Sequence, residues 1–174
     1  MTDRPPLLTR PGSAFAAGQG LLRAEHFQMA WATNDLEAAS ELLSKRLGIH
    51  EFTPIGGPNP MGGETHVLLA WVGTMMYELI TARGPGSDVI MSRLPTDQGF
   101  AMKHHHLGFL ISGPEEWEAL EAETTRAGWA MPHKSVNPGF MTSCFVDVPV
   151  LGHYLEYIMP EAAGVDFFEN VARN

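Results

Sequence analysis

The chain has 174 residues, 44% of them hydrophobic, so it can bury the core of one domain or of two small modules. Asp and Glu number 20 against 11 Lys and Arg, and the resulting formal charge of −9 repels nucleic-acid phosphates and anionic membranes. Apolar runs stay shorter than the roughly 18 residues that span a bilayer, and the single cysteine, Cys144, excludes an intrachain disulfide framework, so we expect a cytoplasmic protein with neither a nucleic-acid nor a membrane partner.

The first half of the chain predicts a strand, a helix and three further strands. After an expected N-terminal leader, residues 1–22, the segment 26–33 reads as a strand. Asn34 and Glu37 have the spacing of a capping box, and leucines at helical spacing follow. Gly48 is expected to end that helix. Three β-rich runs then occupy residues 49–52, 65–72 and 74–82, with a Gly- and Pro-rich loop expected at 56–63.

The second half repeats this order. Residues 105–112 predict a strand, Pro114 suits the first turn of a helix, and Gly128 is expected to end it. The β-rich runs that follow occupy residues 129–133, 140–148 and 153–160. The predicted organisation is a first βαβββ module at 23–83, a linker at 84–101, a second module at 102–160 and a C-terminal tail at 161–174.

Four polar residues occupy matching places in the two modules. Gln28 and Glu78 lie on the first and last strands of the first module, and His106 and Glu156 do so in the second. Both separations are 50 residues. Each glutamate has apolar neighbours on its own strand face, where a carboxylate is costly unless it is paired, solvated or bound to a cation. The alternatives are a solvated outward face for the glutamates, an ordinary strand amide for Gln28, and a hydrogen-bonded, partly exposed histidine at the strand entrance for His106.

If the two modules curl into one cup, these side chains converge. One amide oxygen, one imidazole and two carboxylates then form a first shell suited to a divalent transition metal. Zn, Ni, Co, Mn and Fe(II) are all acceptable for this mixture of ligands. The sequence therefore predicts a divalent metal ion as cofactor and a small molecule as substrate.

The motifs "FQMAWATNDLEAA…LLSKRLG", "MYELI", "HHLGFLI" and "LGHYLEYI" span nearly the whole chain. They resemble the vicinal-oxygen-chelate superfamily, which includes glyoxalases, methylmalonyl-CoA epimerase, bleomycin-resistance proteins and extradiol dioxygenases. The resemblance implies an α+β fold in which two βαβββ modules form a cup-shaped sheet, often in a homodimer. It places the metal ligands on the first and last strand of each module, at Gln28, Glu78, His106 and Glu156.

The resemblance also implies a glyoxalase-like lyase, isomerase or epimerase. In such enzymes a carboxylate removes a proton alpha to a carbonyl and the metal stabilises the enediolate. Glu156 is the expected ligand and base, and Glu78 the expected ligand and partner for the reverse transfer. His153, Tyr154 and Trp31 are candidate substrate-binding residues.

Two other functions fit the same resemblance. One is a metal-free small-molecule binding protein of the bleomycin-resistance type. The other is an extradiol ring-cleaving dioxygenase, whose metal site needs two histidines and one carboxylate. That site would need His26 in place of Gln28, and we expect both on one face because they lie two residues apart. His104 has the same relation to His106.

Overall fold

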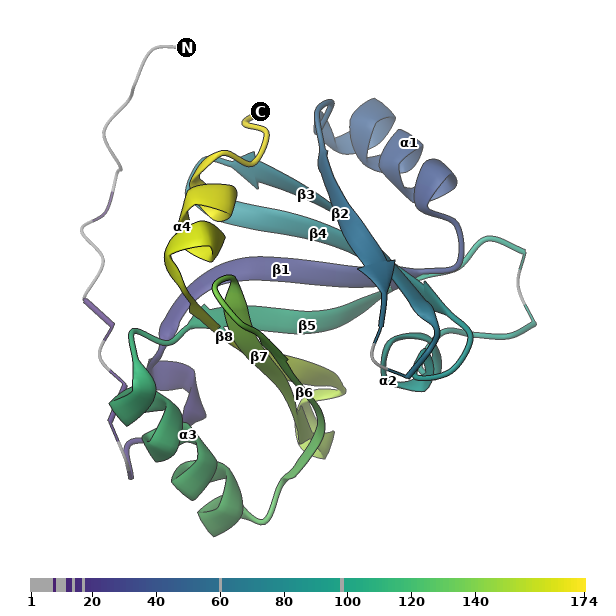
Figure 1. Ribbon diagram of the computed structural model, residues 1–174. Helices are drawn as coiled ribbons and strands as arrows, with labels where there is room; N and C mark the ends of the chain where they lie inside the picture. Colours follow the sequence, from purple (N-terminus) through teal and green to yellow (C-terminus); the bar gives the residue numbers. More distant parts are fainter. Residues whose placement is uncertain (1–7, 9–11, 14, 17, 60, 98) are drawn as a thin grey trace.

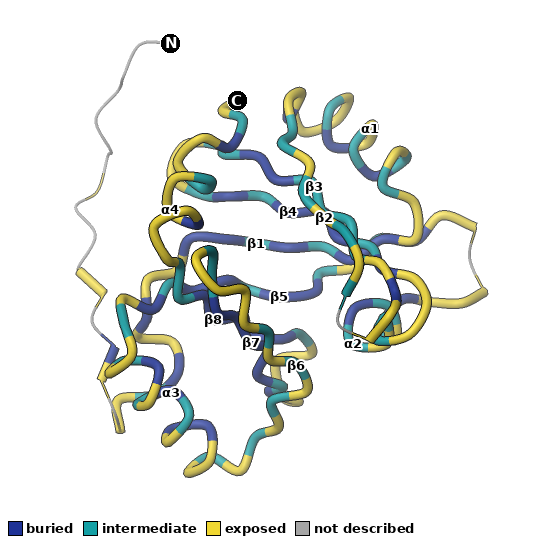
Figure 2. Tube along the Cα trace, viewed as in Figure 1, coloured by how far each residue is buried: buried dark blue, intermediate teal, exposed yellow. Residues whose placement is uncertain are grey.

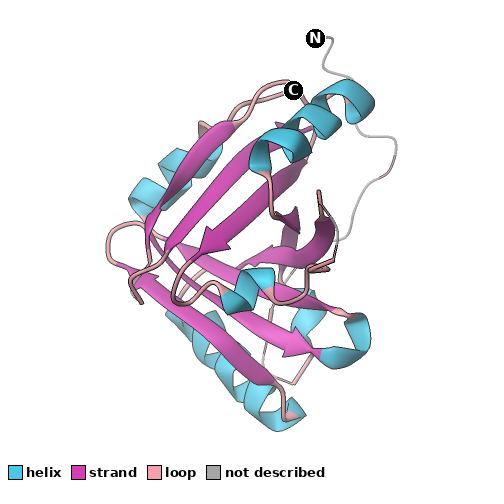
Figure 3. Cartoon of the chain, turned by 90° about the vertical axis from the view of Figure 1, so that its right-hand side faces the viewer, coloured by secondary structure: helices cyan, strands magenta, loops and turns pink. Residues whose placement is uncertain are grey.

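The computed structural model describes residues 8, 12–13, 15–16, 18–59, 61–97 and 99–174. These form one eight-stranded sheet in the order β2-β3-β4-β1-β5-β8-β7-β6, and its two halves lie at an angle to each other (Figures 1 and 3). The strands are β1 Glu25–Thr33, β2 Thr53–Pro58, β3 Glu64–Val72, β4 Met75–Arg83, β5 Met102–Leu110, β6 Ala130–Asn137, β7 Met141–Val148 and β8 His153–Pro160. The α-helices are α1 Leu36–Leu47, α2 Asp88–Met91, α3 Pro114–Ala127 and α4 Ala162–Glu169, and short 3-10 helices occupy Leu21–Arg23 and Pro149–Leu151.

The two halves of the sheet have the same internal pairing. β1 runs parallel to β4, and β5 runs parallel to β8. The remaining strands of each half form an antiparallel meander, and β1 pairs antiparallel with β5 at the centre. The predicted α+β fold of paired βαβββ modules in one curled sheet is confirmed.

Both predicted glycine stops end their helices, whereas the predicted helix start was wrong by one residue. Gly48 and Gly128 have φ values of 76° and 69°, in the left-handed region that favours glycine. The N-cap of α1 is Asp35, whose Oδ1 accepts a 3.0 Å hydrogen bond from the Ala38 amide. The Asn34 side chain instead bonds the backbone of Gly99 and Ala101, so it ties β1 to the segment before β5.

The predicted strand at residues 49–52 was wrong, as was the predicted loop over the first three residues of 56–63. The strand there is β2, Thr53–Pro58, which includes two glycines. A Cβ on Gly56 would lie 2.4 Å from the Thr65 carbonyl oxygen, so only glycine allows β2 to pair this closely with β3. Gly/Pro composition therefore indicated a loop where a tight strand pairing requires glycine.

The helices α1 and α3 cover the outer side of the sheet, and the residues between these helices and the strands are buried (Figure 2). Leu43 of α1 packs with Leu79, and Leu120 of α3 packs with Leu155, all nearly inaccessible. Cys144 lies in the α3-side core, where burial raises the pKa of its thiol to about 12. A thiol in that state is a packing residue and not a nucleophile.

The segments outside the two modules contain structure of their own. The predicted linker contains α2, and the predicted C-terminal tail contains α4. The expected leader lies partly outside the described residues, but Phe15 and Leu21 belong to the α3-side core. The Tyr157 hydroxyl donates a hydrogen bond to the Leu21 carbonyl at 2.5 Å. Among the described residues, no helix is long and apolar enough to cross a membrane.

Candidate metal centre

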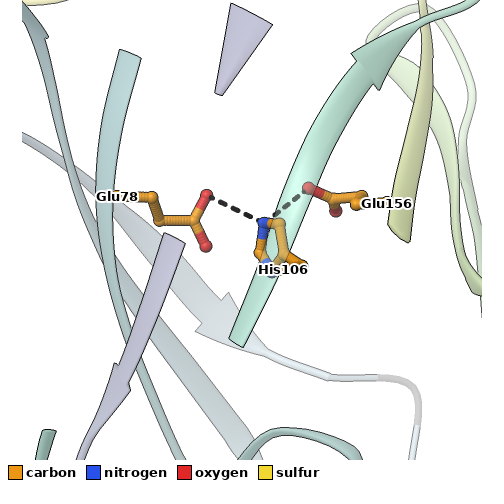
Figure 4. A group of neighbouring side chains, drawn as sticks. All are labelled: Glu78, His106 and Glu156. Carbon is orange, nitrogen blue, oxygen red and sulfur yellow. Dashed lines mark ion pairs between the residues drawn. The ribbon is translucent and has the colours of Figure 1, made fainter. Parts of the chain in front are cut away.

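Glu78 on β4, His106 on β5 and Glu156 on β8 meet inside the curve of the sheet (Figure 4). One ligand atom from each lies within 4.8 Å of the others. His106 Nε2 lies 2.9 Å from a Glu156 carboxylate oxygen and 3.9 Å from one of Glu78. All three side chains are buried, so the carboxylates have little access to bulk water. Such a cluster is stable only with protons or a cation among the charges.

Gln28 completes the set that the sequence predicted. Its strand, β1, lies between β4 and β5, and its Nε2 donates a hydrogen bond to a Glu78 carboxylate oxygen. Its Oε1 is buried and has no hydrogen-bond partner among the described residues. Gly108 makes room for it, because a Cβ at that position would lie 2.4 Å from Gln28 Oε1. The structure therefore brings together all four residues predicted as ligands.

Replacing Gly108 by Ala should displace the Gln28 amide. Overpacking a site of this kind costs about 1–3 kcal/mol, and the shifted amide would lose the hydrogen bond from Nε2 to Glu78 and the present position of Oε1. We expect lower stability in urea and weaker metal binding in titration calorimetry. The matched control is Gly113→Ala, where the added Cβ meets nothing within 4 Å. Equal effects from the two variants would contradict the packing argument.

A bulge in β1 separates His26 from the cluster. The pairing of β1 with β5 shifts between His26 and Gln28, so these two residues do not share a face as we expected. His26 is exposed, its ring packs 5.1 Å from the Phe109 ring, and its Nε2 lies 3.0 Å from the Gln28 carbonyl oxygen. The structure thus places Gln28, and not His26, beside Glu78.

A second register shift places His104 away from His106. The shift lies between Ala30 and Trp31 on β1, opposite His106 and His104 on β5. The His104 ring packs against Trp31 and His153, at centroid distances of 5.9 and 4.7 Å. Trp31 itself packs against the core beside α1.

The three candidate substrate-binding residues are not members of the cluster, although Tyr154 on β8 is the strand partner of His106 on β5. The side chains of Trp31 and His153 both pack against the His104 ring. Tyr154 is buried, and the Arg93 guanidinium carbon lies 3.8 Å from its ring centroid. None of the three is among the described residues that line the cavity at the cluster, so their substrate-binding role stays a prediction.

His105, which the sequence analysis did not single out, orients the imidazole of His106. His105 Nε2 lies 2.9 Å from the Val89 carbonyl oxygen, and the Nδ1 atoms of His105 and His106 lie 2.8 Å apart. A carbonyl only accepts, so His105 donates from Nε2. Burial, with the nearby charge of His106, lowers the pKa of His105 to about 3, which leaves it neutral with an accepting Nδ1. His106 therefore donates from Nδ1 and directs Nε2 at the two carboxylates.

Replacing His105 by Phe should weaken metal binding by about 10–100-fold, the usual effect of losing a group that orients a metal-ligating histidine. Phe keeps the ring but offers no acceptor to His106 Nδ1. Calorimetric titration with Co²⁺ measures the loss. His104→Phe is the matched control, since His104 contacts Trp31 and His153 outside the cluster. An unchanged Co²⁺ affinity in His105→Phe would show that the hydrogen bond has no such role.

The cluster holds protons when no cation is present. Burial raises the pKa of Glu78 to about 7, against the lowering effect of His106. Burial alone would lower the pKa of His106, but the Glu156 and Glu78 carboxylates more than offset this and raise it. A divalent ion would take the place of these protons and neutralise both carboxylates. The bare Gln28 Oε1 and the His106 Nε2 are further donors for it, so the donor set fits such an ion.

A cavity of about 680 Å³ opens beside the cluster. Gln28, Glu78 and Glu156 are among the polar residues that line it. The remaining described lining residues are mainly apolar and include Ile55, Val67, Leu69, Ile80, Phe140, Met141, Phe145, Ile158, Phe167 and Phe168. A small molecule can therefore reach both glutamates from an apolar chamber of ordinary ligand-site size.

Comparisons with known proteins identify the fold. No family model matches the chain, and no curated protein matches it. Among solved structures, a Streptomyces coelicolor methylmalonyl-CoA epimerase in complex with 2-nitronate-propionyl-CoA is 16% identical, with a TM-score of 0.53 over 80% of this chain and 99% of that chain. The Mycobacterium tuberculosis methylmalonyl-CoA epimerase is 15% identical, with a TM-score of 0.54 over 82% of this chain and 91% of that chain. The chain thus shares the fold of these epimerases, and this agrees with the fold that the resemblance implied.

Proposed function

We propose that the protein is a metal-dependent isomerase or lyase that removes a proton alpha to a carbonyl of a small oxygenated substrate. One observation carries the proposal: two carboxylates, an imidazole and an amide converge beside a mainly apolar cavity, which Gln28 and both glutamates line. One of their atoms, Gln28 Oε1, is buried without a hydrogen-bond partner among the described residues, and His106 Nε2 faces the two carboxylates. Buried polar atoms of this kind indicate a missing ligand atom or ion. The similar solved epimerases share the fold and are compatible with this chemistry.

The four residues of the cluster have separate roles in metal binding and proton transfer. Gln28, Glu78, His106 and Glu156 would hold a divalent ion, which stabilises negative charge that develops on a substrate oxygen. Glu156 takes the proton from the substrate carbon, because its carboxylate lines the cavity and lies 2.9 Å from His106 Nε2. Glu78 lines the same cavity from another strand and returns a proton. Return of the proton to the opposite face of the alpha carbon inverts the configuration of that carbon. Return of the proton to the neighbouring, former carbonyl carbon isomerises the substrate.

The two alternative functions differ in what this cluster would bind. A ring-cleaving dioxygenase would need a second histidine, and His26 lies outside the cluster with its ring against Phe109. A metal-free binding protein would leave the buried Gln28 Oε1 without a partner and would keep two carboxylates buried around His106. A divalent ion would supply the missing partner of Gln28 Oε1 and would neutralise both carboxylates.

Metal stoichiometry tests the proposal. Protein stripped with a chelator is titrated with Co²⁺, Ni²⁺, Mn²⁺ and Zn²⁺, and solvent-deuterium exchange at the alpha carbon of 2-hydroxy ketones is followed by NMR. We expect one equivalent of metal, release of protons on binding and exchange only in the loaded protein. Folded protein that binds no metal and still binds small apolar molecules would establish the metal-free alternative.

The assembly and cellular location belong to the same proposal. β2 and β6 are the outermost strands of the sheet, and open edges of this kind favour pairing between two copies. We propose a homodimer in the cytoplasm that acts on a small-molecule substrate.

A further inference from the structure

Three phenylalanines form an aromatic wall in the cavity. Phe140, Phe167 and Phe168 all line it, with ring centroids 5.5, 5.6 and 6.5 Å apart. Two of the rings come from α4, which leads from β8 toward the C-terminus (Figure 1). The wall is therefore supplied largely by residues outside the two modules.

The backbone holds this wall in place. The Glu161 amide donates to the Phe140 carbonyl at 2.8 Å, and the indole NH of Trp71 donates to the Phe168 carbonyl at 2.8 Å. A Cβ on Gly164 would lie 2.2 Å from the Phe140 carbonyl oxygen, so glycine is needed for α4 to lie this close. The wall is thus fixed both to the second module and, through Trp71 of β3, to the first. A preformed wall can bind an apolar group without first ordering side chains.

The cavity offers no free cation to an anionic substrate. Lys134 is the only lysine or arginine among the described residues that line it. Its ammonium lies 2.5 Å from a Glu121 carboxylate oxygen and 5.4 Å from the Trp117 ring centroid, both on α3 outside the cup. Proteins that bind phosphate groups present arginines, lysines or helix N-termini to them. Apart from Lys134, which is paired with Glu121, the described lining of the cavity contains no lysine or arginine, and the chain as a whole has a formal charge of −9.

We propose that the substrate is an uncharged 2-hydroxy ketone with an aromatic group, bound against Phe140, Phe167 and Phe168, and not a CoA ester. This inference rests on the proposed metal-dependent proton transfer. The Glu156 carboxylate takes the proton from the hydroxyl-bearing carbon, and the electron pair of that C–H bond forms a C=C bond as the carbonyl oxygen becomes negative. Return of the proton to the same carbon restores the ketone. Return to the former carbonyl carbon also requires the hydroxyl proton to pass to the former carbonyl oxygen, so that the original hydroxyl oxygen becomes the carbonyl. Neither route consumes an oxidant, a reductant or a second substrate.

A matched pair of ketones tests the aromatic wall. The Co²⁺-loaded protein in D₂O is given 2-hydroxy-1-phenylpropan-1-one, 3-hydroxybutan-2-one, in which methyl replaces phenyl, and methylmalonyl-CoA. We expect kcat/KM for alpha-deuterium exchange of the phenyl ketone to exceed that of the methyl ketone by about 10–100-fold, as hydrophobic pockets discriminate on this scale. Phe167→Ala should abolish most of that ratio. Val165→Ala, on α4 but outside the described lining of the cavity, should preserve it.

The outcomes separate this inference from the proposed function. Faster exchange of methylmalonyl-CoA, an unchanged ratio in Phe167→Ala, or a Co²⁺-loaded protein that does not exchange the phenyl ketone would each overturn the substrate assignment. Failure of the folded protein to bind Co²⁺ would instead overturn the proposed metal-dependent function, together with the inference that depends on it.

Discussion

Replacing Glu156 by Gln should reduce alpha-proton exchange by about 10²–10⁴-fold, the usual contribution of a general base. The amide has nearly the same shape as the carboxylate but cannot accept the proton. Glu156 also lies 2.9 Å from His106 Nε2, so the variant should bind metal more weakly as well. Exchange is therefore measured by NMR at a Co²⁺ concentration that saturates the variant, which separates proton transfer from loss of the ion.

The matched control for this variant is Glu118→Gln, an exposed carboxylate on α3 that lies outside the cavity lining. It should exchange substrate protons at the unaltered rate. If metal-saturated Glu156→Gln retains full exchange, Glu156 is not the base. A large loss in Glu78→Gln alone would then assign that role to Glu78.

Replacing Glu78 by Gln should stabilise the metal-free protein at pH 8 by about 1–3 kcal/mol, since each unit of pKa shift corresponds to about 1.4 kcal/mol. Burial raises the pKa of Glu78 from 4.5 to about 7, so the folded chain holds its proton more tightly than the unfolded chain does. That contribution to stability is fully present below pH 4.5 and is lost as the pH rises through about 7. Gln resembles the protonated carboxyl at every pH, so the advantage of the variant should shrink toward pH 5. Urea unfolding in the presence of a chelator measures it.

Excess metal should reverse the order of stabilities, because an ion that binds only the folded chain stabilises it by mass action. The wild-type protein should then exceed Glu78→Gln. Glu64→Gln serves as a control, since its exposed carboxylate is paired with Arg83 and its pKa is lowered, first by that hydrogen bond. A Glu78→Gln protein that is less stable than wild type in chelator at pH 8 would contradict our explanation that the buried charge of Glu78 destabilises the metal-free protein.

The strand periodicity and the internal repeat predicted the two βαβββ modules, and the resemblance to a known superfamily implied the cup in which the four polar side chains meet. Gln28 and Glu78, like His106 and Glu156, are placed by equivalent strands of two similar units, and the spacing of 50 residues records that equivalence. The glycines that end the two helices could also be predicted, because Gly48 and Gly128 adopt a left-handed conformation that other residues rarely take.

The errors lie where the strands are irregular. Alternation along an ideal strand put His26 on the face of Gln28 and gave no reason to notice His105. The register shifts in the pairing of β1 with β5 move His26 away from Gln28 and bring His105 next to His106. Such a shift depends on the partner strand, and strand pairing cannot be derived from a single sequence. The run of three histidines was the available signal, since a bulge can turn adjacent side chains to one side. Gly56 was wrongly predicted to lie in a loop, because the absence of a side chain instead allows β2 to pair closely with β3.

Anomalous diffraction from crystals of the Co²⁺-loaded protein tests the central claim most directly. We predict one strong peak bonded to His106 Nε2, to Gln28 Oε1 and to a carboxylate oxygen of each of Glu78 and Glu156, the atoms that already converge beside the cavity. A peak elsewhere on the chain, or a fully folded protein with no peak at this position, would contradict the assignment of a metal centre.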